Sequence, residues 1–401
     1  MKTEFDIVIV GGAMAGATLA LALADQHRSD GARWRIALVE AQPPQAAGHP
    51  GFDSRAIALA HGSVRRLQQL ELWSALAPYA AAIERIEVSD QGHFGGLTMT
   101  AQEYGVDALG QVVELERIGP VLWQQLAARS VTLLCPQQLS SVQQQQDHVT
   151  LTLCSGEQLT TRLLVGADGT HSPVRQALGL GLRQQDYHQT ALIANVRAEQ
   201  HDGRAFERFT AQGPLAMLPM CERRYSLVWV QSPEQAARRL ALSERAFLAE
   251  LQAAFGYRLG ALQRVGQRAS YPLALCKAER VIHHRCVLVG NAAQTVHPIA
   301  GQGFNLGLRD VEALAELLDG VDDPGAFALL HRYEQQRRAD RGRTTGSTDA
   351  LVRLFSNSSR LMALGRNSGL LAMSVLPGLK RRLAHQAMGW RNEANEPGGR
   401  R

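Results

Sequence analysis

The first chemistry-bearing pattern of the chain is a glycine-rich turn followed, roughly twenty residues later, by an acid. An apolar run over residues 5–10 predicts a buried strand, an Ala/Leu-rich run ending near Ala24 predicts a helix, and residues 35–39 predict a second strand that ends at Glu40. The turn between strand and helix consists of Gly11, Gly12, Ala13, Met14, Ala15 and Gly16. Such a unit binds a dinucleotide, with the pyrophosphate at the helix start and the ribose hydroxyls on the acid, although the methyl group of Ala13 narrows the turn.

A second glycine-rich stretch lies between residues 287 and 310. Its Val-rich start predicts a strand that stops at Gly290, and apolar residues at helical spacing predict a helix that begins near Gly301, Gln302 and Gly303. Unpaired N–H groups and aligned peptide dipoles make a helix start positive, and glycines let a flat ligand contact the main chain. An anionic ring such as a reduced isoalloxazine would be stabilised there. The alternative is that the glycines only shape a turn.

The third stretch is a predicted strand and turn over residues 163–175. Asp168 and Gly169 occupy the turn, Ser172 is a predicted helix N-cap, and Pro173 suits the first helical position. An Asp in such a turn is usually structural, and a role in cofactor binding is the alternative.

These three motifs, in the order in which they occur along the chain, resemble those of the FAD-dependent aromatic hydroxylases. The segment 290–307 resembles the family's second flavin motif, with Asn291 in place of the usual Asp, and the turn at Asp168 resembles the Asp-Gly motif near the flavin pyrophosphate, which is implicated in NAD(P)H use. Asn291 can donate and accept hydrogen bonds, so it could still contact the ribityl hydroxyls. Segments 52–59, 206–210, 214–220 and 294–298 resemble the ubiquinone-biosynthesis branch of the family.

The resemblance also implies site residues outside the glycine motifs. Arg55 and Gln111 would contact the flavin, whereas the alternatives are a surface charge and a plain loop glutamine. His297 and Pro298 lie on the loop beside the proposed reaction centre and are the catalytic candidates, although His297 could equally be a hydrogen-bonded structural residue. The predicted cofactor-binding residues are Gly11, Gly12, Ala13, Met14, Ala15, Gly16, Glu40, Arg55, Gln111, Asp168, Gly169, Asn291, Gly301, Gln302, Gly303 and Asn305, and no metal site is predicted.

The activity implied by the resemblance is hydroxylation of a polyprenyl phenol in ubiquinone biosynthesis. NAD(P)H or another donor would reduce FAD, O₂ would add at the flavin C4a carbon, and the hydroperoxide would hydroxylate the ring, while the protein positions the flavin and excludes water. Two other functions fit the same motifs. One is a flavin-dependent oxidoreductase that acts on another lipid without oxygen transfer, and the other is a non-catalytic flavin-binding subunit of a biosynthetic assembly.

The expected fold is α/β, with a Rossmann-like FAD-binding domain, an inserted, mostly antiparallel β-sheet substrate domain and a C-terminal helical region. At 401 residues the chain exceeds the usual size of a single core, and β-type segments without glycine motifs follow one another between residues 182 and 275. The FAD-binding domain is expected at 1–82, 110–181 and 276–323, the substrate domain at 83–109 and 182–275, and the helical region at 324–401. Four side chains of the inserted sheet are candidates for lining a substrate pocket, and the alternative is that they belong to its core: Phe206, Met217, Pro219 and Trp229.

Composition indicates a globular protein. Hydrophobic residues make up 45% and charged residues 20% of the chain, which argues against disorder, and no apolar run approaches the length of a membrane span. The start of the chain lacks the pattern of a signal peptide, and the five dispersed cysteines contain no Cys-x-x-Cys pair, which favours reduced thiols. We therefore expect a cytoplasmic protein, peripheral at the inner face of the membrane if it binds one.

The net charge of +5 is concentrated in the last part of the chain, after Arg337. Basic residues flank apolar ones there, a pattern typical of a helix that binds a membrane surface or a partner protein. The alternative is a packed helical cap with a solvated charged face. Expected partners are the phenol and O₂, with a membrane surface and other quinone-biosynthesis proteins as further ones, and no nucleic acid. The basic residues are Arg337, Arg338, Arg341, Arg343, Arg353, Arg360, Arg366, Lys380, Arg381 and Arg382.

Overall fold

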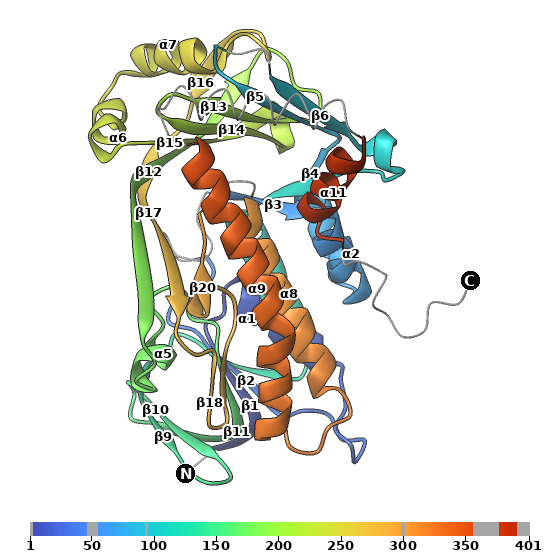
Figure 1. Cartoon of the computed structure of the whole chain (residues 1–401). Helices are drawn as coiled ribbons and strands as arrows, with labels where there is room; N and C mark the ends of the chain where they lie inside the picture. The colour runs from blue at the N-terminus through green and yellow to red at the C-terminus, as the bar shows by residue number, and fades with distance from the viewer. Residues whose placement is uncertain (1–2, 46–54, 93–94, 298–300, 356–376, 391–401) are drawn as a thin grey trace. The chain divides into compact units, whose positions relative to one another are not determined.

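The computed structural model describes residues 3–45, 55–92, 95–297, 301–355 and 377–390 (Figure 1). The chain forms two compact units that it enters alternately. Unit 1 comprises Met1–Ile57, Glu114–Gln189 and Pro272–Val352, and unit 2 comprises Ala58–Val113, Thr190–Tyr271 and Arg353–Arg401. Strands β12 (Leu182–Ala198) and β17 (Ala269–Ala278) each continue from one unit into the other. The assignment of segments to a cofactor or a substrate domain stays a prediction.

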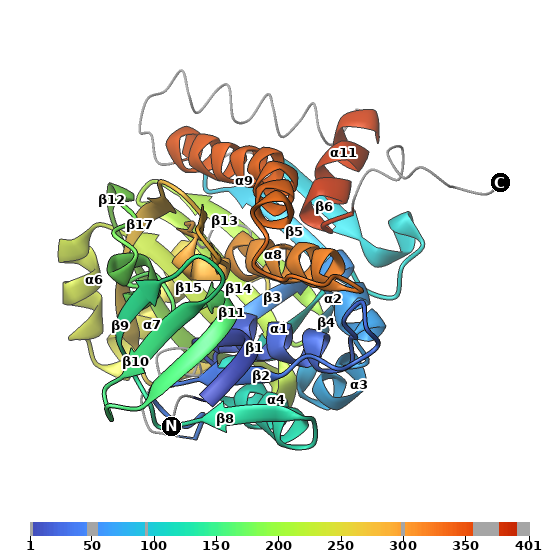
Figure 2. The same ribbon diagram turned by 90° about the horizontal axis from the view of Figure 1, so that it is seen from below.

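Unit 1 is built on a sheet whose central strands are parallel (Figure 2). Strand β1 (Thr3–Val10) lies between β11 (Gln158–Gly166) and β2 (Ile36–Val39) and is parallel to both. The apolar residues of β1 and β2 are buried without alternation, as expected of strands covered on both faces. The outer strands are β8 (Val131–Leu134), β9 (Leu139–Gln144), β10 (Val149–Leu153), β18 (Ile282–His283) and β19 (Cys286–Leu288).

Helix α1 (Met14–Ala24) packs on this sheet through small and aliphatic side chains, and α8 (Gln302–Leu318) packs on α1. Helix α1 follows β1 directly and is buried apart from Ala15, which suits its Ala/Leu composition. Helices α8 and α9 (Phe327–Phe355) lie side by side in both views (Figures 1 and 2). The other two are α4 (Leu115–Ala127) and α5 (Pro173–Ala177). None of the helices within the described ranges is long and apolar enough to cross a membrane.

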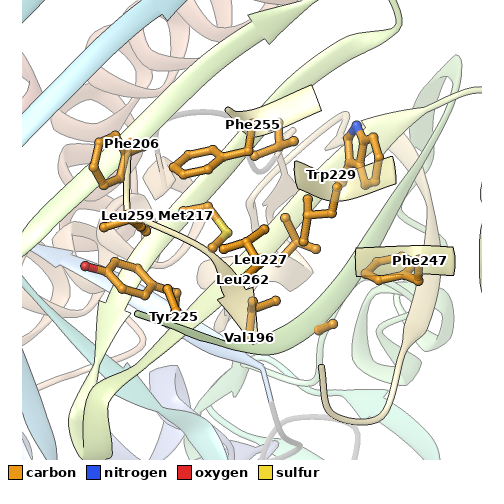
Figure 3. Packing of buried hydrophobic residues seen from close by; sticks show 14 of the residues in the cluster. Val196, Phe206, Met217, Tyr225, Leu227, Trp229, Phe247, Phe255, Leu259 and Leu262 are labelled. Carbon is orange, nitrogen blue, oxygen red and sulfur yellow. The ribbon is translucent and has the colours of Figure 1, made fainter. Parts of the chain in front are cut away.

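Unit 2 contains a mostly antiparallel sheet with strand order β12-β15-β14-β13-β5-β6. One face of this sheet packs against α6 (Pro233–Leu240) and α7 (Glu244–Phe255) around a hydrophobic core (Figure 3). Phe206, Met217 and Trp229 belong to this core and are at most 1% exposed, so the expectation that they are core residues is confirmed. The strands are β5 (Arg85–Asp90), β6 (Gly96–Thr100), β13 (Arg204–Thr210), β14 (Gly213–Met220), β15 (Arg224–Gln231) and β16 (Leu262–Val265).

A smaller group of elements completes unit 2. A three-stranded sheet has the order β3-β7-β4, formed by β3 (Ala56–Ala60), β7 (Gly110–Glu114) and β4 (Ala80–Ile83). Two short helices follow β3, α2 (His61–Gln69) and α3 (Trp73–Leu76), and they are separate because Glu71 between them is left-handed with φ of 57°. Helix α11 (Pro377–Ala387) leads to Met388, whose carbonyl accepts a hydrogen bond from Gly62 N at 2.8 Å.

Candidate cofactor site

The first glycine-rich turn has a shape that only glycine permits. Gly11 has a φ of 102°, and a Cβ atom on it would lie 2.5 Å from the carbonyl oxygen of Ala167. A Cβ atom on Gly16 would lie 1.8 Å from the carbonyl oxygen of Gly11, so this glycine allows α1 to pack closely on β1. The N-cap residue Ala13 makes no side-chain capping bond, which leaves the first N–H groups of α1 for a ligand. This backbone fits a pyrophosphate group.

Glu40 is tied to the same turn. Its Oε2 accepts a hydrogen bond from Gly12 N at 2.5 Å, and its Oε1 accepts one from Gln42 N at 3.1 Å. Trp123, on α4, donates from Nε1 to the carbonyl of Gly12 at 3.0 Å. The carboxylate therefore shapes the turn, and its type of side chain is one that accepts hydrogen bonds from ribose hydroxyls. The sequence carries no signal for this role of Trp123, because Gly12 lies 111 residues away along the chain.

Asp168 lies in the turn that follows β11. Oδ2 of Asp168 accepts a hydrogen bond from Val174 N at 2.8 Å, while Oδ1 is buried and has no hydrogen-bond partner in the described part of the chain. Burial raises the pKa of Asp168, and hydrogen bonds from Ser172 and Val174 oppose that shift. Ser172 also accepts from Arg175 N at 2.9 Å with Pro173 next to it, so the predicted helix start is confirmed.

The second glycine-rich turn leads into α8. Gly301 is the N-cap, with φ of 61°, and no side chain caps the helix, so its first N–H groups are also available to a ligand. Asn305 donates from Nδ2 to the carbonyl of Gly301 at 2.7 Å, which holds the turn. Gly303 differs, because its φ is not positive and a Cβ atom there would lie at an ordinary 3.7 Å from Val296 Cγ2. No described residue therefore requires a glycine at position 303, and a bound ligand is the reason that we test.

Arg175 joins the second and third motifs. Its Nη1 donates to the carbonyls of Thr170 at 2.9 Å and Ala292 at 3.3 Å, and its side chain is buried. The hydroxyls of Thr170 and Thr295 lie 2.7 Å apart and bridge the same two turns. The sequence showed Arg175 only as part of a motif, because Ala292, its partner in the other turn, is distant along the chain.

Asp310 on α8 anchors the other side of the second motif. Its Oδ2 accepts from Gly290 N at 3.2 Å, and its Oδ1 accepts from Arg337 Nε at 2.7 Å and Arg341 Nη2 at 3.1 Å. All three charged side chains are buried. Our expectation that Arg337 and Arg341 belong to a basic surface is therefore wrong for these two residues, because they neutralise a buried carboxylate.

His297 is buried, and its ring contacts that of Tyr187 edge-on with centroids 5.3 Å apart. Burial lowers the pKa of His297 to about 4, so the imidazole is neutral near pH 7. A neutral ring cannot stabilise an anion by charge, and its catalytic role stays a prediction. Pro298 lies outside the described residues.

The remaining residues that are predicted to contact the cofactor differ in how far they are buried and in which element carries them. Arg55 is half-buried before β3, and its carbonyl accepts from Leu115 N at 3.0 Å. Asn291 is exposed on the turn after β19, as a ligand-facing amide would be in a structure without ligand. Gln111 lies on β7 and is paired with Ala82 in the small sheet. Their contacts with a cofactor stay predictions, as does that of Gln302.

Residues 4–345 match a family model described as an FAD binding domain. The chain belongs to this family, and its class is that of the FAD-dependent hydroxylases, which are monooxygenases. FAD is therefore the cofactor, in agreement with the two uncapped helix starts, the glycine turns and Glu40. The expected α/β fold is confirmed.

Among curated relatives, ubiquinone hydroxylase UbiL of Rhodospirillum rubrum is 40% identical over 403 residues, covering 98% of this chain and 91% of that protein. The 3-demethoxyubiquinol 3-hydroxylase of Escherichia coli is 33% identical and covers 96% of this chain and 98% of its own length. The solved structure of p-nitrophenol 4-monooxygenase PnpA from Pseudomonas putida has a TM-score of 0.79 at 19% identity, with 97% of this chain and 99% of that chain covered. This last likeness shows the fold alone.

Proposed function

We propose that this hydroxylase acts on the ring of a polyprenyl phenol in ubiquinone biosynthesis, with NAD(P)H as electron donor. The observation that carries the proposal is the near full-length similarity to two relatives named for hydroxylation of ubiquinone or its precursor, at 40% and 33% identity. The fit of unit 1 to FAD supports the same conclusion, since all three motifs lie in that unit. FAD, when bound, supplies electron acceptance from NAD(P)H and the activation of O₂.

The residues of unit 1 have binding and positioning roles in this proposal. The start of α1 binds the pyrophosphate, Glu40 accepts the ribose hydroxyls, and the start of α8 stabilises negative charge on the flavin ring. Asp310 and Arg175 position the turns that carry these groups. His297 lies on the loop that we place beside the flavin ring, and its neutral imidazole contributes no charge there.

The substrate we favour is 2-polyprenyl-6-methoxyphenol, on the motif resemblance in segments 52–59 and 294–298. Of these two relatives, the Escherichia coli protein has a name that specifies a ring position and the Rhodospirillum rubrum protein does not, so similarity by itself supports the pathway more strongly than the position. A strain that lacks its own hydroxylase for one position is the direct test. Restored ubiquinone would identify that position, and accumulation of the same intermediate with and without this chain would contradict it.

The purified protein gives a second, independent test. We expect noncovalently bound FAD, NAD(P)H oxidation stimulated by a short-chain 2-prenylphenol, O₂ uptake and hydroxylated product in equal amounts. Reduction of a lipid without O₂ uptake would instead identify the oxidoreductase alternative. Bound FAD with no turnover of any phenol would favour the non-catalytic subunit.

A further inference from the structure

The sheet of unit 2 has a second face, opposite to the core in Figure 3, and one acid lies in the middle of it. Side chains alternate along a strand, so Phe206 points into the core and Glu207 points to the other face. The strand pairing places Glu207 beside Ala216 on β14 and beside Val88 on β5. The whole row across the sheet is Ile193, Val228, Ala216, Glu207, Val88 and Leu97.

This row is apolar except for Glu207, and it is less covered than the core face. Ile193, Val228, Ala216 and Val88 are half-buried and Leu97 at the end of the row is buried, whereas Trp229 and Met217 on the core face are 0% exposed. A sheet face of this composition can bind a flat apolar molecule, because binding removes the apolar surface of both the sheet and the molecule from water. The one carboxyl in the row then specifies a polar group on that molecule.

The carboxyl of Glu207 has no partner in the described protein. No hydrogen bond or ion pair joins its side chain to another described residue, and burial alone raises its pKa to about 7. A half-buried acid in apolar surroundings normally has a donor, since leaving it unpaired is costly.

We infer that Glu207 binds the hydroxyl group of the phenol substrate, while the apolar residues of its row contact the substrate's ring. A carboxylate accepts a hydrogen bond from a phenolic O–H, and a neutral phenol adds no charge to an apolar surface. This inference rests on the proposed function, and it names the residue that selects a free phenol over an alkylated one. It also accounts for an acid in a row where every other side chain is apolar.

The test compares two probes, 2-geranylphenol and its methyl ether, which differ only in the hydroxyl donor. Binding is measured at pH 8 from the change in flavin absorbance of the FAD-loaded protein. We expect the wild type to bind the phenol 10- to 100-fold more tightly than the ether, as for a hydrogen bond to a charged group. Glu207→Gln should shrink this preference, and Glu207→Leu should abolish it while keeping affinity for the ether.

The matched control is Glu87→Gln. Glu87 lies beside Phe206 on the neighbouring strand, points to the core side and pairs with Arg204 at 3.5 Å. This variant should keep the wild-type preference, and all variants should keep their flavin content and thermal midpoint. A Glu207→Leu protein that still prefers the phenol by the wild-type ratio would overturn the inference.

A wild type with no preference for the phenol would overturn it as well. The proposed function fails separately, through the strain complementation and O₂ uptake described above, because those measurements do not depend on how the hydroxyl is recognised. Restored ubiquinone together with an unchanged preference in Glu207→Leu would leave the function standing and remove Glu207 from substrate binding.

Discussion

Replacing Asp310 by Asn should destabilise unit 1 and weaken FAD binding together. Asp310 is 0% exposed and is the shared acceptor of Arg337 and Arg341, which are 3% and 8% exposed. Removing its charge leaves two buried guanidinium groups, and among the described residues Asp340, which pairs with Arg337, is the one remaining acid in an ion pair with either of them. Breaking a buried ion pair from one side costs about 3 to 5 kcal/mol, so we expect a loss of that size in the free energy of unfolding.

The effect on FAD follows from the second oxygen of Asp310. Gly290 N donates to Oδ2 at 3.2 Å, and an Asn that keeps its oxygen toward the arginines would turn its NH₂ group toward this N–H. Two donors cannot pair, so the turn at Gly290 should shift and FAD should bind more weakly. Leaving a buried N–H donor without an acceptor costs about 1 to 3 kcal/mol, and this is the size of the loss in FAD-binding free energy that we expect.

The assay is denaturant unfolding of the FAD-free protein, followed by titration with FAD. Asp30→Asn is the control, because Asp30 pairs with Arg28 at 2.7 Å but is 50% exposed, and such pairs contribute at most about 1 kcal/mol. An Asp310→Asn protein with an unfolding free energy within about 0.5 kcal/mol of wild type and unchanged FAD affinity would refute the reasoning.

Three further perturbations test other parts of the structure. Gly303→Val should lose flavin or release peroxide while the FAD-free protein melts normally, since Val296 leaves room for a Cβ atom; native flavin content and coupling would show that this glycine only shapes a turn. Burial lowers the pKa of His297 to about 4, so as the pH falls the unfolded chain binds a proton on this ring before the folded protein does. The free energy of unfolding should therefore decrease by up to about 3 kcal/mol between pH 6.5 and pH 4. Equal decreases in wild type and in His297→Gln would contradict this. Exchanging Arg381, which is exposed, for Gln should weaken binding to anionic vesicles by about 1 kcal/mol without loss of FAD, whereas Lys380 already pairs with Glu103; unchanged binding of the Arg381 variant at low salt would argue against a membrane-facing α11.

Features set by neighbouring residues could be predicted from the sequence alone. The strand, glycine turn and helix around Gly11 and Gly16, the N-cap at Ser172 and the helix beginning near Gly301 all depend on contacts a few residues apart. Turn geometry, capping and periodicity act at that range, so local sequence carries them. Glu40 belongs to the same group, because the spacing of strand, turn and strand places it at the end of β2.

Tertiary structure decided the features that depend on pairing across the chain. Arg337 and Arg341 look like surface charges in sequence, and only the packing of α9 beside α8 shows that they neutralise Asp310. Whether Glu207 or Phe206 faces the core depends on the register of β13, since a slip of one residue would exchange the two faces. Local sequence determines which elements form and where their turns lie. Long-range packing determines the partner of a buried charge, because a charged side chain loses its water only once the fold has enclosed it.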